Sequence, residues 1–147
     1  MSIELKLFIG LLLAFVGDYI TQGNRISQEK TKRFLPAFIH ATIYSLPFLV
    51  VCWSWTWFIL WISHFFIDRY RLAVYVVRLK NFSFGLECIE TKIPEGLSYK
   101  YKWVFRMPDA SNFGFPKEVP AFMSIWLMII VDNVIHVCIN SMCIYFG

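Results

Sequence analysis

The residues best suited to chemistry lie where charged groups are least expected. All three histidines and three of the four aspartates fall inside strongly apolar stretches: His40, His64, His136, Asp18, Asp68 and Asp132. An aspartate at the centre of a membrane helix costs about 2.5 to 3.5 kcal/mol on insertion scales. Three such aspartates therefore require compensation, either by a metal ion or by a network of mutual hydrogen bonds.

The spacing of these residues favours convergence from several helices. His64 and Asp68 are four residues apart, so both side chains project from one helical face. Asp132 and His136 repeat the spacing in reverse order, and Asn140 continues the same stripe. Helix bundles build metal sites from ligands at this spacing on facing helices.

Imidazole and carboxylate ligands together suit Zn²⁺, Mn²⁺ or Fe²⁺. We expect five metal ligands and one general base, Asp18, with four further polar residues supporting them. The ligands are His40, His64, Asp68, Asp132 and His136, and the supporting residues are Gln22, Tyr44, Asn133 and Asn140. This set exceeds what one zinc needs, so either two metals bind or some aspartates only orient a histidine ring. Purely structural hydrogen bonding between helices is the alternative for each residue taken singly.

The composition favours a membrane protein. Of the 147 residues, 58% are hydrophobic and 19% aromatic, against about 45 to 50% apolar residues in soluble domains. Four apolar segments at about 3–20, 34–51, 55–70 and 124–146 predict an all-α fold, a polytopic four-helix membrane bundle forming a single domain over 1–147. The first segment lacks a basic start and a cleavage site, so it is read as a retained helix. The four cysteines lack C-x-x-C spacing and are expected to be inert.

Basic residues predict the orientation. The 23–33 loop and the 71–119 insert are rich in Lys and Arg, which places both on the cytoplasmic side of a bacterial inner membrane and both termini outside. Within the insert, residues 69–80 predict an interfacial helix that continues from the third span. Alternation over 86–93 and 97–105 around Pro94-Glu95-Gly96 predicts a β-hairpin.

Depth along the helices gives a further expectation. Asp18, His40, His64 and Asp68 all fall within about 9 Å of the cytoplasmic end of their segments at 1.5 Å per residue. His136 matches that depth only if the fourth span starts near Trp126, with residues 120–125 lying in the interface. We therefore expect that start.

Several stretches together carry a resemblance. They are Gly17-Asp-Tyr-Ile-Thr-Gln22, His64-Phe-Phe-Ile-Asp-Arg69, Asn112-Phe-Gly-Phe-Pro116 and Trp126-Leu-Met-Ile-Ile-Val-Asp-Asn-Val-Ile-His136. The chain resembles a family of small, uncharacterised multi-pass inner-membrane proteins of bacteria and phages. It is more distantly similar to membrane-bound metal-dependent hydrolases, through membrane-embedded His and Asp motifs.

Three functions are compatible with these patterns. The first is metal-dependent hydrolysis of a lipid-linked phosphate or ester near the cytoplasmic face. The second is a proton or ion pathway, since Asp and His chains also form relays. The third is a non-catalytic membrane module that binds another protein through the basic insert. Membrane lipids, a partner membrane protein or a second copy are the expected partners, and nucleic acid is not.

Overall fold

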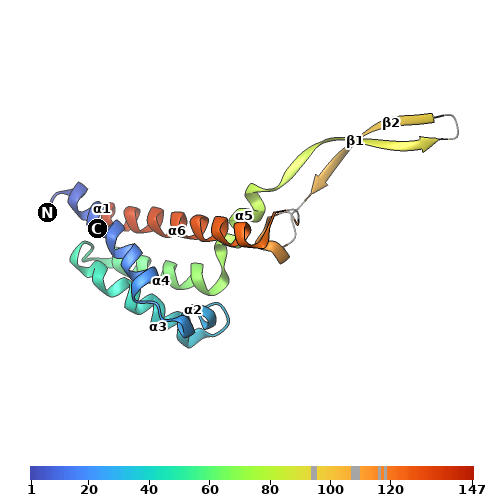
Figure 1. The fold of residues 1–147 in the computed structure, drawn as a ribbon. Helices are drawn as coiled ribbons and strands as arrows, with labels where there is room; N and C mark the ends of the chain where they lie inside the picture. The colour runs from blue at the N-terminus through green and yellow to red at the C-terminus, as the bar shows by residue number, and fades with distance from the viewer. Residues whose placement is uncertain (94–95, 107–109, 116, 118) are drawn as a thin grey trace. The chain divides into compact units, whose positions relative to one another are not determined.

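The computed structural model describes residues 1–93, 96–106, 110–115, 117 and 119–147. This part of the chain is mostly helical and carries one two-stranded sheet (Figure 1). It forms two compact units: Met1–Ala73 with Ile129–Gly147, and Val74–Met128. The first unit contains every His and Asp singled out above.

The first unit begins with helix α1 (Ile3–Phe15), whose first turn is capped by the Ser2 hydroxyl accepting from the Leu5 amide. The helix then widens into a π-helical segment, η1 (Val16–Ile20), which carries Asp18. The i→i+5 bond from the Thr21 amide to the Val16 carbonyl defines this wider turn. A short helix, α2 (Asn24–Glu29), follows.

Two further helices complete the core of this unit together with the C-terminal helix, α6 (Ala121–Phe146). Helix α3 (Phe34–Ser45) gives way to a 3₁₀ segment, η2 (Leu46–Val50), because Pro47 cannot continue the α-helical hydrogen bonds. Helix α4 (Trp55–Tyr70) starts at a Ser54 cap and is joined to α3 by Trp57, whose indole N–H donates to the Ser45 carbonyl at 2.8 Å. The buried apolar core consists of Ala14, Tyr44, Phe48, Val51, Cys52, Leu60, Cys143 and Ile144.

The second unit holds most of helix α5 (Leu72–Lys80) and the hairpin of β1 (Ser83–Ile93) and β2 (Gly96–Arg106). The strands are antiparallel, with Ser83 opposite Arg106 and Ile93 opposite Gly96. The predicted strand pair is therefore present and extends slightly beyond its predicted ends. The turn predicted at Pro94-Glu95 lies outside the described residues. A 3₁₀ turn, η3 (Ala110–Asn112), precedes helix α6 (Ala121–Phe146).

The predicted polytopic four-helix membrane bundle is wrong. Within the described residues, α6 is the one helix long and apolar enough to cross a membrane. The other apolar segments break up: α1 ends after 13 residues, α3 after 12, and α4 has 16, which is about 24 Å against about 30 Å of hydrocarbon. The predicted multi-pass topology, and with it the placement of both termini outside, is therefore not supported.

Two finer expectations also differ from the structure. The helix predicted to continue from the third span stops at Tyr70, because Arg71 adopts a left-handed backbone conformation (φ 52°) and α5 begins after it. The fourth helix begins at Ala121 without a break near Trp126. His136 nevertheless lies 3.6 Å from Asp68, so a helix that starts at Ala121 still brings His136 to the other ligands.

Candidate metal centre

Six chemically active side chains of the first unit converge from four elements. Asp18 comes from η1, His40 from α3, His64 and Asp68 from α4, and Asp132 and His136 from α6. They form two groups that could each hold a metal ion. The first group is Asp18, His40, His64 and Asp68, and the second is Asp68, Asp132 and His136.

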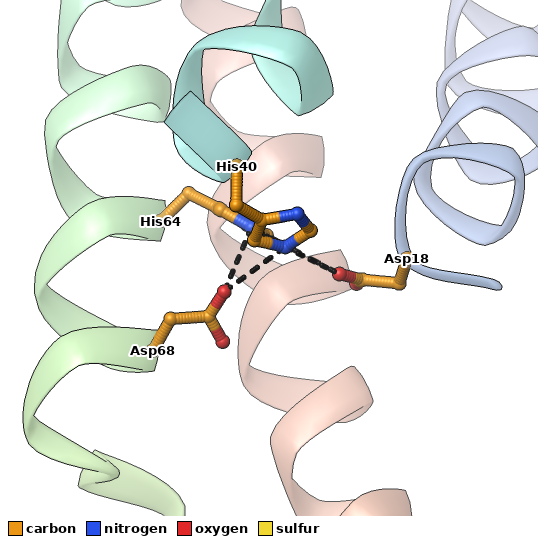
Figure 2. A group of neighbouring side chains, drawn as sticks. All are labelled: Asp18, His40, His64 and Asp68. Atoms are coloured by element: carbon orange, nitrogen blue, oxygen red, sulfur yellow. Dashed lines mark hydrogen bonds and ion pairs between the residues drawn. The ribbon is translucent and has the colours of Figure 1, made fainter. Parts of the chain in front are cut away.

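In the first group, ring nitrogens and carboxylate oxygens point toward one another (Figure 2). His40 Nε2 lies 3.1 Å from His64 Nε2, 3.1 Å from Asp68 Oδ2 and 3.2 Å from Asp18 Oδ1. His64 Nε2 lies 3.2 Å from Asp68 Oδ2 and 3.9 Å from Asp18 Oδ1. Both imidazoles and Asp68 are buried, whereas Asp18 is partly exposed.

Hydrogen bonds among the histidines and aspartates alone do not satisfy this arrangement. An imidazole nitrogen carries either one proton or one lone pair, so it makes one strong hydrogen bond. His40 Nε2 has three atoms that could bind a metal within 3.2 Å: His64 Nε2, Asp68 Oδ2 and Asp18 Oδ1. Convergence of several lone-pair donors on one point is the arrangement that surrounds a cation.

The second group is wider. His136 Nε2 lies 3.6 Å from Asp68 Oδ1 and 3.7 Å from Asp132 Oδ2. Both separations exceed hydrogen-bond length. The His136 nitrogen is buried and has no hydrogen-bond partner among the described residues. A buried polar atom without a hydrogen-bond partner is costly, and a cation held between this nitrogen and the two carboxylates would satisfy it.

Asp68 joins the two groups. Its Oδ2 faces His40 and His64, and its Oδ1 faces His136. The carboxylate is only 3% exposed. One carboxylate that directs each oxygen at a different ligand group is placed to bridge two cations.

Lys30 is a member of the centre that the sequence analysis missed. Its ammonium lies 2.8 Å from Asp68 Oδ2, 3.2 Å from His40 Nε2 and 3.0 Å from Gln22 Oε1. The lysine belongs to a basic loop between apolar segments, where the sequence assigned it only a part in orienting the chain. No local spacing signal distinguishes it from Lys32 or Arg33.

Stacking and one buried hydrogen bond fix the ring of His64. Tyr44 packs on this imidazole with ring centroids 3.6 Å apart and planes inclined by 17°. Asn140 Nδ2 donates to the Tyr44 hydroxyl at 2.7 Å. Gly17 makes room for the tyrosine, because a Cβ there would lie 2.5 Å from the Tyr44 ring.

The remaining supporting residues are placed differently. Gln22 reaches the centre through Lys30. Asn133 does not contact the centre among the described residues, and its amide donates instead to the Tyr19 hydroxyl at 2.6 Å and to the Ile129 carbonyl at 2.8 Å. Of the cysteines, Cys52 and Cys143 are buried in the apolar core, away from either ligand group.

The surroundings shift the pKa of several ligands. Burial opposes ionisation of Asp68, but the nearby imidazoles outweigh it and hold its pKa well below the usual value. Burial likewise opposes the charged form of His40, yet hydrogen bonds to Asp18 and Asp68 raise its pKa. Burial, with the neighbouring His136, lowers the pKa of His64 to about 4, which keeps this imidazole neutral.

Comparison with known proteins identifies a family. Neither the curated proteins nor the solved structures include a match to this chain. A family model described as "Protein of unknown function (DUF3307)" matches residues 7–88, more than half of the chain. The matched segment contains the whole first ligand group and Lys30, while Asp132 and His136 follow it. The chain therefore belongs to the DUF3307 family.

Proposed function

We propose that this protein binds two divalent metal ions and uses them for hydrolysis. His40, His64 and Asp68 of the first group hold one ion, the second group holds the other, Asp68 bridges them, and Asp18 acts as general base. The observation that carries the proposal is the buried His136 nitrogen, which has no hydrogen-bond partner in the described chain and faces two carboxylates at 3.6 and 3.7 Å. These separations are too long for hydrogen bonds and suit two ligands of a shared ion.

The distances support ligation in quantitative terms. Two ligand atoms about 2.0–2.1 Å from a tetrahedral zinc ion lie about 3.4 Å apart. The separations in the two groups, from 3.1 to 3.9 Å, bracket that value. The ligand set of imidazoles and carboxylates suits Zn²⁺, Mn²⁺ or Fe²⁺, and neither group includes a cysteine among the described residues.

Charge supports an anionic substrate. The three carboxylates supply three negative charges, and the four positive charges of two divalent cations would exceed them. Divalent cations in such a centre would polarise a phosphoryl or carbonyl oxygen. Asp18 is the proposed general base: it is more exposed than Asp68, at 13% against 3%, and so is placed to accept the proton of an attacking water.

Exposed apolar side chains support a lipid-linked substrate. Soluble proteins rarely expose large contiguous apolar patches. Six apolar side chains of the first unit are each at least 46% exposed: Phe8, Leu12, Phe15, Ile20, Phe34 and Leu35. Helix α6 itself is a candidate membrane helix. A phosphate or ester attached to a lipid would meet these surfaces, and the membrane of a bacterium is the proposed location.

Metal content tests this proposal. We would purify the protein in detergent, remove metal with a chelator, reload it with Zn²⁺ or Mn²⁺, and count bound ions by mass spectrometry. The variants His64→Ala and His136→Ala should each lose metal. Ser63→Ala is the matched control, because within the described part of the chain its hydroxyl donates to the Leu60 carbonyl of its own helix and not to the centre.

Activity tests the chemistry separately. Hydrolysis of p-nitrophenyl phosphate and p-nitrophenyl acetate by the reloaded protein should depend on metal. Asp18→Asn should lose most of this hydrolysis while retaining bound metal, because its proposed role is proton transfer. Metal binding without hydrolysis of either probe would contradict the proposed hydrolysis and leave the metal centre standing.

A second candidate function has its own observation. The ion pair between Lys30 and Asp68, at 2.8 Å, already supplies a positive charge to the first group. The His and Asp side chains would then lock the helices of a non-catalytic module that binds another protein. This candidate predicts that chelation leaves the unfolding temperature unchanged and that Lys30→Met lowers it. An ion pathway lacks such support, because its polar groups should be spread along a path, whereas these gather around Asp68.

A further inference from the structure

Lys30 occupies the position in the first ligand group where a cation is expected. Its ammonium contacts Asp68 Oδ2 at 2.8 Å and His40 Nε2 at 3.2 Å. These are the same two atoms that face His64 Nε2 at 3.2 and 3.1 Å. An ammonium cannot share those lone pairs with a metal ion at bonding distance, so the two cations compete for the same atoms.

We propose that Lys30 is an internal cation that holds the first ligand group together without metal and is displaced when a divalent ion binds there. The inference rests on the proposed metal centre and adds a regulatory part to it. Removing metal from such a cluster would otherwise leave buried carboxylates facing one another, which is costly unless a positive charge replaces the ion. Lys30 supplies that charge.

The location of Lys30 allows the exchange. The residue follows the last residue of α2, in the turn that leads to α3, and its side chain is 14% exposed. A lysine ammonium is a point charge on a flexible four-carbon stem. Rotation of that stem is enough to take the ammonium from Asp68 to solvent. Gln22, on the link between η1 and α2, accepts from the ammonium through its Oε1 at 3.0 Å.

The exchange has a consequence for affinity. Metal binding at the first group must break the Lys30–Asp68 ion pair, and the displaced ammonium still repels the incoming cation. Both effects weaken binding. A variant without the ammonium should therefore bind metal more tightly than the parent, which is the opposite of what removal of a ligand does.

Metal titration of a charge-matched pair of variants tests the inference. The proteins are the parent, Lys30→Met and Lys32→Met, titrated with Zn²⁺ after chelation. Lys32 is an exposed lysine two residues away, so its replacement removes the same charge without touching the centre. We expect Lys30→Met to bind about tenfold more tightly, which corresponds to about 1.4 kcal/mol. Lys32→Met should match the parent.

A second measurement uses the parent protein alone and does not depend on how a variant folds. Acetylation with an N-hydroxysuccinimide ester, read by mass spectrometry at each lysine, reports whether an ammonium is accessible. Addition of Zn²⁺ should raise the labelling rate of Lys30 severalfold and leave that of Lys32 unchanged. Unchanged Lys30 labelling in metal-loaded protein would overturn the displacement.

The outcomes separate this inference from the proposed function. Zn²⁺ binding by the parent with equal or weaker binding by a folded Lys30→Met would overturn the role of Lys30 and leave the metal centre standing. Failure of the parent and of Lys30→Met to bind Zn²⁺ would overturn both. Tighter Zn²⁺ binding by Lys30→Met but not by Lys32→Met, with increased labelling of Lys30 in the metal-loaded parent, supports both the metal centre and the displacement of Lys30.

Discussion

The ring of Tyr44 stacks on the imidazole of His64, with centroids 3.6 Å apart and planes inclined by 17°. This contact ties the candidate metal centre to the apolar core, because Tyr44 also stacks on Phe48 at 5.4 Å. It fixes the plane of His64 and therefore the direction of its Nε2. The geometry of the ligands thus depends on packing as well as on ligand identity.

Gly17→Ala should damage the centre without changing any ligand. The new Cβ would lie 2.5 Å from the Tyr44 ring, so either the ring or η1 must move. Overpacking of this kind costs about 1–3 kcal/mol of unfolding free energy. Denaturant unfolding and Zn²⁺ titration should both show a loss. Gly23→Ala is the control, because nothing lies within 4 Å of its Cβ position; equal effects of the two variants would refute the steric argument.

Tyr44→Phe should destabilise the protein by about 1–3 kcal/mol, because it leaves the buried Asn140 amide without its acceptor. Tyr19→Phe offers a close comparison. It removes the same type of bond, from Asn133 at 2.6 Å, at an exposed position, so water can replace the hydroxyl. Unfolding free energies of the two variants measure the difference. Similar small losses for both would show that the Asn140 bond contributes little.

Metal affinity should fall as the solution becomes acidic. His40 must be deprotonated to bind metal. Burial lowers the pKa of His40 in the metal-free protein, but its hydrogen bonds to Asp18 and Asp68 outweigh burial, so the pKa is raised overall. Affinity should rise with pH up to the raised pKa of His40, by about tenfold per pH unit when one proton is released. Calorimetric titration in two buffers of different ionisation enthalpy counts that proton. A pH-independent affinity with no proton release would contradict the assignment of His40.

The sequence was sufficient to find the candidate ligands but insufficient to find what surrounds them. The four-residue spacings of His64 with Asp68 and of Asp132 with His136 depend only on helical periodicity, and helices α4 and α6 provide it. The hairpin was likewise readable from alternation. Lys30 was not, because its contact with Asp68 joins residues 38 apart and depends on how the turn after α2 folds against α4.

The errors have a common physical cause. Apolar composition predicts continuous membrane spans, but interruptions of the backbone hydrogen bonding decide the length of each helix. The π-helical segment η1 ends α1 and also turns Asp18 toward the centre, and no sequence pattern foretold it. The left-handed Arg71 ends α4 without a glycine or proline to mark the position.

The metal content of the reloaded protein tests the central claim most directly. We expect two ions per chain in the parent, fewer in His136→Ala, and the largest loss in Asp68→Asn, since Asp68 faces both ligand groups. Parent protein that retains no stoichiometric Zn²⁺ or Mn²⁺ after reloading, while remaining folded, would contradict it.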